Sequence, residues 1–383
     1  MTTKKNNEHK KLNVPNLRFP EFQGEWEKCK LGDYGKVVTG NTPPTKDIEN
    51  YENGTYLWAS PADLGTIKLI SETKTMLSAK GFSKTRALPK GSVLVTCIGS
   101  TIGKTGMATK EMSTNQQINS IVVNENSDNE FVYYSIQSAF PRYLSSIAVQ
   151  AVPIISKSAF ELLPNQRPCL QEQKKIGKML SLLDERIATQ NKIIEDLKKL
   201  KCAIAERLFK VTNGEVVALS EVCNIQKGKQ VNGDCLSETG TYYVMNGGTE
   251  PSGYYEQCNA PADTISISEG GNSCGYIQYN REAFWSGGHC YTLTDIQPNV
   301  CNLYLYHYLK SKESAIMKLR IGTGLPNIQK KDLEKFAVLL PPVAKQVRIS
   351  TFLTAIERKT TNEEILLSHF QEEKQYLLRQ MFI

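Results

Sequence analysis

Two long stretches of the chain carry apolar residues at alternating steps of four and three. The first runs from Cys169 to Lys210 with no internal proline and one glycine. This spacing is typical of the seam of a coiled coil, so we predict two long helices that bury their stripes against each other. The expected seam residues are Ile176, Leu180, Leu183, Ile187, Ile194, Leu197, Ile204 and Leu208, then Ile349, Leu353, Ile356, Leu367, Phe370, Leu377 and Met381. From Ile176 to Leu208 such a helix would be about 50 Å long at 1.5 Å per residue.

Both stretches belong to an internal repeat. Pro168 and Pro341, like Gln173 and Gln346, lie 173 positions apart, and the polar breaks in the two seams fall at equivalent places. Upstream, "LGDYGKVVTG" from Leu31 parallels "LSEVCNIQKG" from Leu219, 188 positions later. The order is therefore A–B–A′–B′, with each globular unit followed by one long helix.

The two A segments lack long helical periodicity. They contain short runs rich in β-forming residues, such as "KVVTG" and "INSIVVN", then "TYYVMNGG" and "CYTLTD", which Gly, Asn, Pro and Ser interrupt. A few short helices, such as "EFVYYSIQSAF" and "NLYLYHYLKSK", are also expected. The pattern predicts an α+β fold of two β-rich domains, each followed by a long helix.

Composition says little about function, but it argues against some classes of protein, namely secreted, membrane-spanning and metal-binding ones. The net charge of +7 is compatible with a nucleic-acid partner without requiring one. The polar N-terminus and the lack of long apolar runs indicate neither a signal peptide nor a membrane span. We therefore expect a cytoplasmic protein with ten reduced cysteines. Because the cysteines form no C-x-x-C pair and the four histidines have no ligand spacing, no metal site is expected.

The stretch "GSTIGKT" at Gly99–Thr105 raises the alternative of a nucleotide hydrolase. A phosphate-binding loop needs four residues between its glycines and a helix after the Lys-Thr pair. Here three residues separate Gly99 from Gly103, and a further β-prone run follows. The second unit has Gly271 and Gly275 at the equivalent place without the lysine, so the turn is interpreted as part of the fold. We expect no catalytic residue in this chain.

The glycine-bearing turns carry the side chains that can discriminate DNA bases. Asn and Gln pair with adenine through two hydrogen bonds, and Arg and Lys pair with guanine, although any one of these residues also suits an ordinary turn. The candidates in the first unit are Thr39, Asn41, Lys46, Lys84, Arg86, Ser100, Lys104, Asn115 and Gln116. Those in the second are Lys227, Lys229, Gln230, Asn246, Asn272, Tyr276 and His289.

Three segments carry a family resemblance: "PNLRFPEFQGEWEKCKLGD" from Pro15, "QEQKKIGKMLSLLDERIATQNKIIEDLKKLK" from Gln171, and the terminal "KQYLLRQMFI". With the repeat, they make the chain similar to the specificity (S) subunits of type I restriction-modification systems over nearly its whole length. The resemblance implies target-recognition domains at 1–165 and 212–340. It also implies that the helices at 166–211 and 341–383 pair as an antiparallel coiled coil.

The same resemblance implies partners and their cofactors. Each domain would read one half of an asymmetric, bipartite site on double-stranded DNA, with the coiled coil setting the spacer and docking two methyltransferase (M) subunits. Motor-nuclease (R) subunits would complete the complex. S-adenosylmethionine, ATP and Mg²⁺ would belong to those partners, with no cofactor in this chain. The remaining alternative is a coiled-coil scaffold whose globular ends bind proteins, which the steep salt dependence of DNA binding would distinguish.

Overall fold

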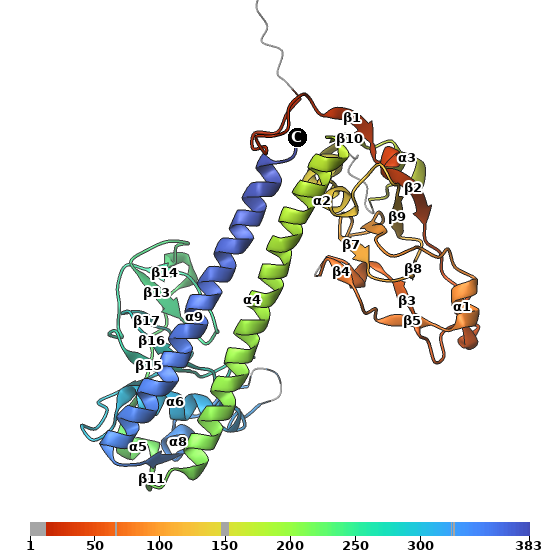
Figure 1. The fold of residues 1–383 in the computed structure, drawn as a ribbon. Helices are drawn as coiled ribbons and strands as arrows, with labels where there is room; N and C mark the ends of the chain where they lie inside the picture. Colours follow the sequence, from red (N-terminus) through yellow and green to blue (C-terminus); the bar gives the residue numbers. More distant parts are fainter. Residues whose placement is uncertain (1–12, 66, 147–152, 323, 325) are drawn as a thin grey trace, which may run out of the picture. The chain divides into compact units, whose positions relative to one another are not determined.

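The computed structural model describes residues 13–65, 67–146, 153–322, 324 and 326–383 (Figure 1). The chain divides into two compact units. Unit 1 combines the chain up to Thr189 with Leu367–Ile383, and unit 2 is Gln190–Leu366. Each unit contains one β-rich domain and a segment of each of the two long helices.

In unit 1 the main sheet has five strands in the order β2-β9-β6-β7-β4. Their bounds are β2 Gly35–Thr39, β9 Ile118–Val123, β6 Val93–Thr96, β7 Thr105–Ala108 and β4 Leu69–Ile70. The smaller sheet is β5 (Thr75–Leu77), β3 (Tyr56–Ala59) and β8 (Ser113–Thr114), and β1 (Glu27–Lys30) pairs with β10 (Pro164–Arg167). The helices of this domain are α1 (Ala79–Ser83), α2 (Asn129–Ser146) and α3 (Lys157–Glu161).

Unit 2 repeats this arrangement. Its main sheet is β12 (Asn224–Lys227), β18 (Cys290–Thr294), β15 (Thr264–Ser268) and β16 (Ile277–Asn280), in that order. Its smaller sheet is β14 (Tyr254–Tyr255), β13 (Tyr242–Met245) and β17 (Trp285–Ser286), and β11 (Glu215–Ala218) pairs with β19 (Ala337–Leu340). The helices are α5 (Leu219–Val222), α6 (Asn302–Ser311), α7 (Glu313–Met317) and α8 (Lys330–Glu334). The prediction of two β-rich domains is confirmed. The order β12-β18-β15-β16 in unit 2 corresponds to β2-β9-β6-β7 in unit 1, where β4 adds a fifth strand.

The two long helices are α4 (Leu170–Val211, 42 residues) and α9 (Val343–Gln380, 38 residues), and they pair with each other (Figure 1). All fifteen residues that the sequence analysis places in the seam are buried or half-buried. The apolar stripe of each helix is therefore removed from water, which is the main source of stability for an amphipathic helix.

Polar contacts fix the direction and register of this pair. In unit 2 the Gln190 amide donates to the Glu363 carbonyl oxygen at 3.0 Å, and Lys201 forms an ion pair of 2.7 Å with Glu357. The partner on α9 has a lower residue number (357 against 363) where the residue on α4 has a higher one (201 against 190), so the helices are antiparallel. Gln190 and Glu363 are equivalent in the 173-residue repeat, so copies of one seam position face each other across the pair.

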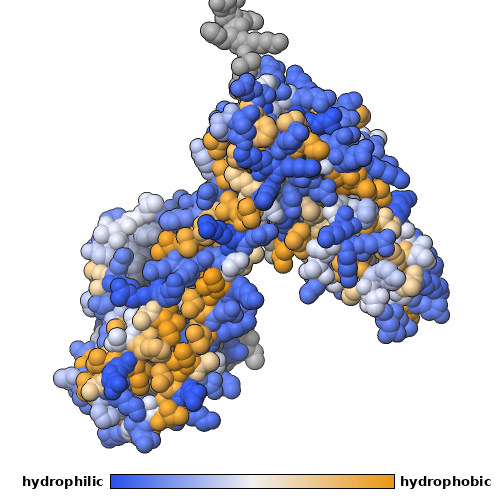
Figure 2. Space-filling view, in the orientation of Figure 1, coloured by the Kyte–Doolittle hydropathy of each residue, from blue (hydrophilic) through white to orange (hydrophobic). Residues whose placement is uncertain are grey.

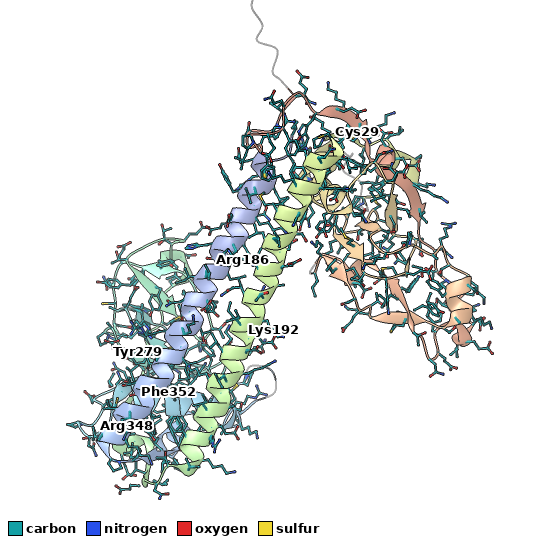
Figure 3. All side chains as sticks on the ribbon, in the orientation of Figure 1. Cys29, Arg186, Lys192, Tyr279, Arg348 and Phe352 are labelled. Carbon is teal, nitrogen blue, oxygen red and sulfur yellow. The ribbon has the colours of Figure 1, made fainter. Side chains whose placement is uncertain are left out.

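Unit 1 contains the counterpart of the second contact. Lys374 on α9 lies 2.6 Å from Asp184 on α4, and these two residues are the repeat equivalents of Lys201 and Glu357. Arg186, labelled in Figure 3, also lies over the Phe370 ring at 5.5 Å. The same lysine–carboxylate bridge thus links the two helices inside each unit.

Each domain attaches to the carboxylate of its own bridge. The Tyr134 hydroxyl of α2 donates to Asp184 at 2.5 Å, and the Tyr306 hydroxyl of α6 donates to Glu357 at 2.9 Å. Burial alone would raise the pKa of Glu357, but Lys201 and the Tyr306 hydroxyl hold it below its usual value. One carboxylate therefore joins a β-rich domain to both long helices.

His307 on α6 marks a pH-sensitive point of this attachment. Its ring is buried, and Nε2 lies 2.9 Å from the Thr354 hydroxyl on α9. Burial, together with the nearby Lys201, lowers the pKa of His307 to about 4. The folded protein therefore holds this imidazole neutral at pH values where an unfolded chain would protonate it.

We predict that unit 2 loses stability as the pH falls from about 6.5, the usual pKa of histidine, to about 4. Over this range the unfolded state takes up a proton that folded His307 refuses, which costs up to about 1.4 kcal/mol per pH unit. Denaturant unfolding of the wild type and of His307→Gln across this range measures the effect. The variant should show a shallower decline, and equal declines in both proteins would contradict the prediction.

Candidate nucleic-acid interface

The glycine turn of each main sheet is a structural element. Gly99, Gly103, Gly271 and Gly275 all have φ between 76° and 97°, a conformation that favours glycine. A Cβ added to Gly103 would lie 2.6 Å from the Phe140 ring, so the backbone must pass closely there. Strand β7 follows the turn in unit 1 and β16 follows it in unit 2. A phosphate-binding loop requires a helix N-terminus at this point, so this turn is not one.

The two domains share a backbone frame around this turn. Cys97 N donates to the Gln117 carbonyl at 2.8 Å, and its repeat equivalent Glu269 N donates to the His289 carbonyl at 2.9 Å. The Ile155 and Ile328 amides donate in turn to the carbonyls of Cys97 and Glu269. Equivalent positions in the two domains therefore occupy equivalent places, whatever side chain they carry.

Several candidates in unit 1 bond within their own domain. The Asn41 amide donates to the Lys84 carbonyl at 2.8 Å and accepts from the Arg86 amide at 3.0 Å, which ties two loops together. Thr39 donates to the Asn119 side-chain oxygen at 2.6 Å. Asn115 is buried and bonds to Gln117, which the sequence analysis did not select. These contacts shape the loops that carry the more exposed side chains.

The charged candidates of unit 1 differ in how freely they can approach a ligand. Lys84 lies 3.1 Å from Asp47, and the Arg86 guanidinium donates to the Thr39 carbonyl at 2.6 Å. Lys46, Ser100 and Gln116 are exposed, and Gln116 accepts a hydrogen bond from Thr42. Lys104 is half-buried and lines a groove with Phe140 and Lys374.

In unit 2 the candidates gather around a residue that the sequence analysis missed. The Glu269 carboxylate is buried and lies 2.7 Å from the Lys227 ammonium and 3.7 Å from Nδ1 of His289. The Tyr291 hydroxyl donates to the same carboxylate at 3.0 Å, and this contact helps to raise the pKa of Tyr291, which burial raises most. A charged group thus lies directly beneath two exposed candidates.

The remaining candidates of unit 2 differ in their contacts and exposure. The Asn246 side-chain oxygen accepts from the His289 backbone amide at 3.0 Å. The Lys310 ammonium lies 3.9 Å from the centre of the Tyr276 ring. Burial is the main cause that raises the pKa of Tyr276. Lys229, Gln230 and Asn272 are exposed.

The described part of the chain holds no group of three or more His, Cys, Asp or Glu side chains arranged to bind a metal ion. Among the described residues, no helix has the length and hydrophobicity that crossing a membrane requires.

Comparison with known proteins identifies the family of the chain. The family model of the type I restriction modification DNA specificity domain matches residues 23–199 and 212–368. The MjaIX specificity subunit of Methanocaldococcus jannaschii, a type I restriction enzyme subunit, is 24% identical over 390 residues, covering 89% of this chain and 88% of that protein. The HindI specificity subunit of Haemophilus influenzae is 28% identical over 202 residues, covering 50% of this chain and 42% of that protein.

Solved structures share the fold. The crystal structure of a type I restriction-modification S subunit from M. genitalium has a TM-score of 0.69 at 20% identity, covering 97% of this chain and 99% of that one. A chain from a structural study of complex assembly and conformational transition in the type I R-M system has a TM-score of 0.58 at 18% identity, covering 93% and 97%. The chain therefore belongs to the type I restriction-modification DNA specificity family and is a non-catalytic specificity subunit.

Proposed function

We propose that each β-rich domain reads one half of an asymmetric, bipartite DNA site, and that α4 and α9 set the spacer and dock two M subunits. The target-recognition domains are residues 1–165 and 212–340, and the helical regions are 166–211 and 341–383. Motor-nuclease subunits join this assembly to cleave DNA. S-adenosylmethionine, ATP and Mg²⁺ act in those partners, and this chain supplies recognition in the cytoplasm.

One observation supports this proposal above the others. The two domains share the order of four main-sheet strands and the backbone hydrogen bonds around their turns, but they carry different polar side chains at equivalent positions. Lys227 in one domain stands where Thr39 stands in the other. Two readers with one frame and different donors and acceptors suit two half-sites of different sequence.

The length of the seam supports a spacer near one DNA turn. From Ile176 to Leu208 the seam spans about 50 Å at 1.5 Å per residue. One turn of B-DNA is about 34–36 Å, so a helix pair of this length is long enough to span the gap between two half-sites.

Apolar residues beside the seam support the docking role. In unit 2, Ile193 and Leu200 on α4 and Phe352 and Leu366 on α9 remain 39–51% exposed. Steps of seven on α4 and fourteen on α9 keep each pair on one face of its helix. Figure 2 shows hydrophobic residues gathered over α9, and Figure 3 labels Phe352 there. Exposed apolar surface of this kind is typical of a protein interface.

We predict that the chain co-expressed with its M subunit methylates a single two-part DNA motif with a fixed gap. The two halves should differ in sequence because the polar side chains of the two readers differ. Genome-wide mapping of methylated bases by single-molecule sequencing measures this, with the M subunit expressed alone as the control. A continuous motif, or no methylation from a soluble complex, would overturn the proposal.

We predict that Leu200→Glu weakens the complex with the M subunit at least tenfold, because burying one unpaired charge at an interface costs more than about 1.4 kcal/mol. Co-purification and titration of the two subunits measure this. Cys202→Glu is the matched control, because two residues further along α4 the side chain points about 200° away and is also exposed. Equal losses in both variants, or no loss in Leu200→Glu, would contradict the docking surface.

A further inference from the structure

Four positions in each domain lie at or near the ends of three neighbouring strands and are related by the repeat. The strands are β2, β9 and β6 in unit 1 and β12, β18 and β15 in unit 2. The positions are Thr39, Cys97, Gln117 and Asn119 in unit 1, and Lys227, Glu269, His289 and Tyr291 in unit 2. We propose that these positions are the specificity-determining site of each reader, and that Lys227 and His289, positioned by Glu269, read a guanine in the second half-site. The inference rests on the proposed function, because it assumes that both domains read DNA.

The equivalence of the two sets rests on strand register as well as on sequence. Thr39 on β2 lies opposite Asn119 on β9, and Lys227 on β12 lies opposite Tyr291 on β18. The residue at the turn, Cys97 or Glu269, donates its backbone amide to the carbonyl of the third position in its set, Gln117 or His289. The sets therefore occupy the same place on the same frame.

Burial divides each set into a supporting pair and a presented pair. Cys97 and Asn119 are 1% and 3% exposed, and Glu269 and Tyr291 are 6% and 3% exposed. Above the second pair, the side chains of Lys227 and His289 are 53% and 64% exposed. The buried residues thus determine the environment of the side chains that reach the surface.

The second set presents hydrogen-bond donors with little net charge. Glu269 Oε1 lies 2.7 Å from the Lys227 ammonium and accepts from the Tyr291 hydroxyl at 3.0 Å. A lysine neutralised by a buried carboxylate attracts phosphate weakly but keeps donors for a base edge. The guanine edge in the major groove offers two acceptors, N7 and O6, which matches a site that contains an ammonium donor.

The first set contains no ionised side chain. Thr39 donates to the Asn119 oxygen at 2.6 Å, and the Gln117 side-chain oxygen accepts from Asn115 at 3.0 Å. At the turn, burial raises the pKa of the Cys97 thiol to about 12, so this group is neutral near pH 7. Hydroxyl and amide groups both donate and accept, so the first reader offers a different pattern to its half-site.

The test uses the full chain in complex with its M subunit and maps methylated sites for four variants. Glu269→Gln keeps the shape and removes the charge, and His289→Ala removes an exposed ring. Both should reduce discrimination at one guanine of the second half-site about tenfold or more, without changing the first half or the gap. Gln117→Ala should relax only the first half-site. His369→Ala, an exposed histidine on α9, is the matched control and should leave the motif unchanged.

The outcomes separate a reading site from a structural ion pair. An unchanged motif in both Glu269→Gln and His289→Ala would overturn the inference, as would equal relaxation of both half-sites. Relaxation at a base other than guanine would overturn the base assignment. If Glu269→Gln is insoluble, His289→Ala decides, because its side chain lies on the surface. A wild-type complex that methylates no two-part motif would instead contradict the proposed function.

Discussion

The apolar contact between α4 and α9 supplies part of the core of both β-rich domains. In unit 1, Ile176 and Leu180 of α4 and Leu378 of α9 pack in one cluster with strand and α2 residues. In unit 2, Ala205 and Phe209 of α4 join Leu353 of α9 in the corresponding cluster. Neither domain closes its core without both helices, so loss of the helix pairing would expose the core of each reader to water.

Polar side chains fix the register of α4 against α9. The buried amide of Gln190 is paired with Glu363, and an unpartnered buried amide is costly. The bridges Lys201–Glu357 and Lys374–Asp184 add the same requirement in each unit. A slide of one heptad would break these contacts while leaving the apolar seam largely filled, so the polar groups select one alignment.

The sequence predicted the helices and the fold class because their signals are periodic. The seam from Ile176 to Leu208 follows one rule of spacing, and the repeat supplied a second copy as a check. The reading site depends on contacts between residues far apart in the chain, such as Lys227 and Glu269, which no local pattern encodes. Glu269 was not among the candidates, and its burial beneath Lys227 and His289 follows from the pairing of β12, β15 and β18. Asn41 shows the converse, because its amide is engaged by its own neighbouring loop.

The residues that make up the hydrophobic core of unit 1 also affect the order in which the protein folds during translation. Leu378, Met381 and Phe382 pack against residues such as Trp26 and Phe131, and the Leu17 amide donates to the Gln380 carbonyl at 2.9 Å. Unit 2 is continuous in sequence, whereas unit 1 needs residues made after all of unit 2. At about 5–20 residues per second, the roughly 180 residues between Thr189 and Leu367 take on the order of ten seconds or more to translate. The domain that leaves the ribosome first is therefore completed last, and during that interval its apolar surface is a target for chaperones.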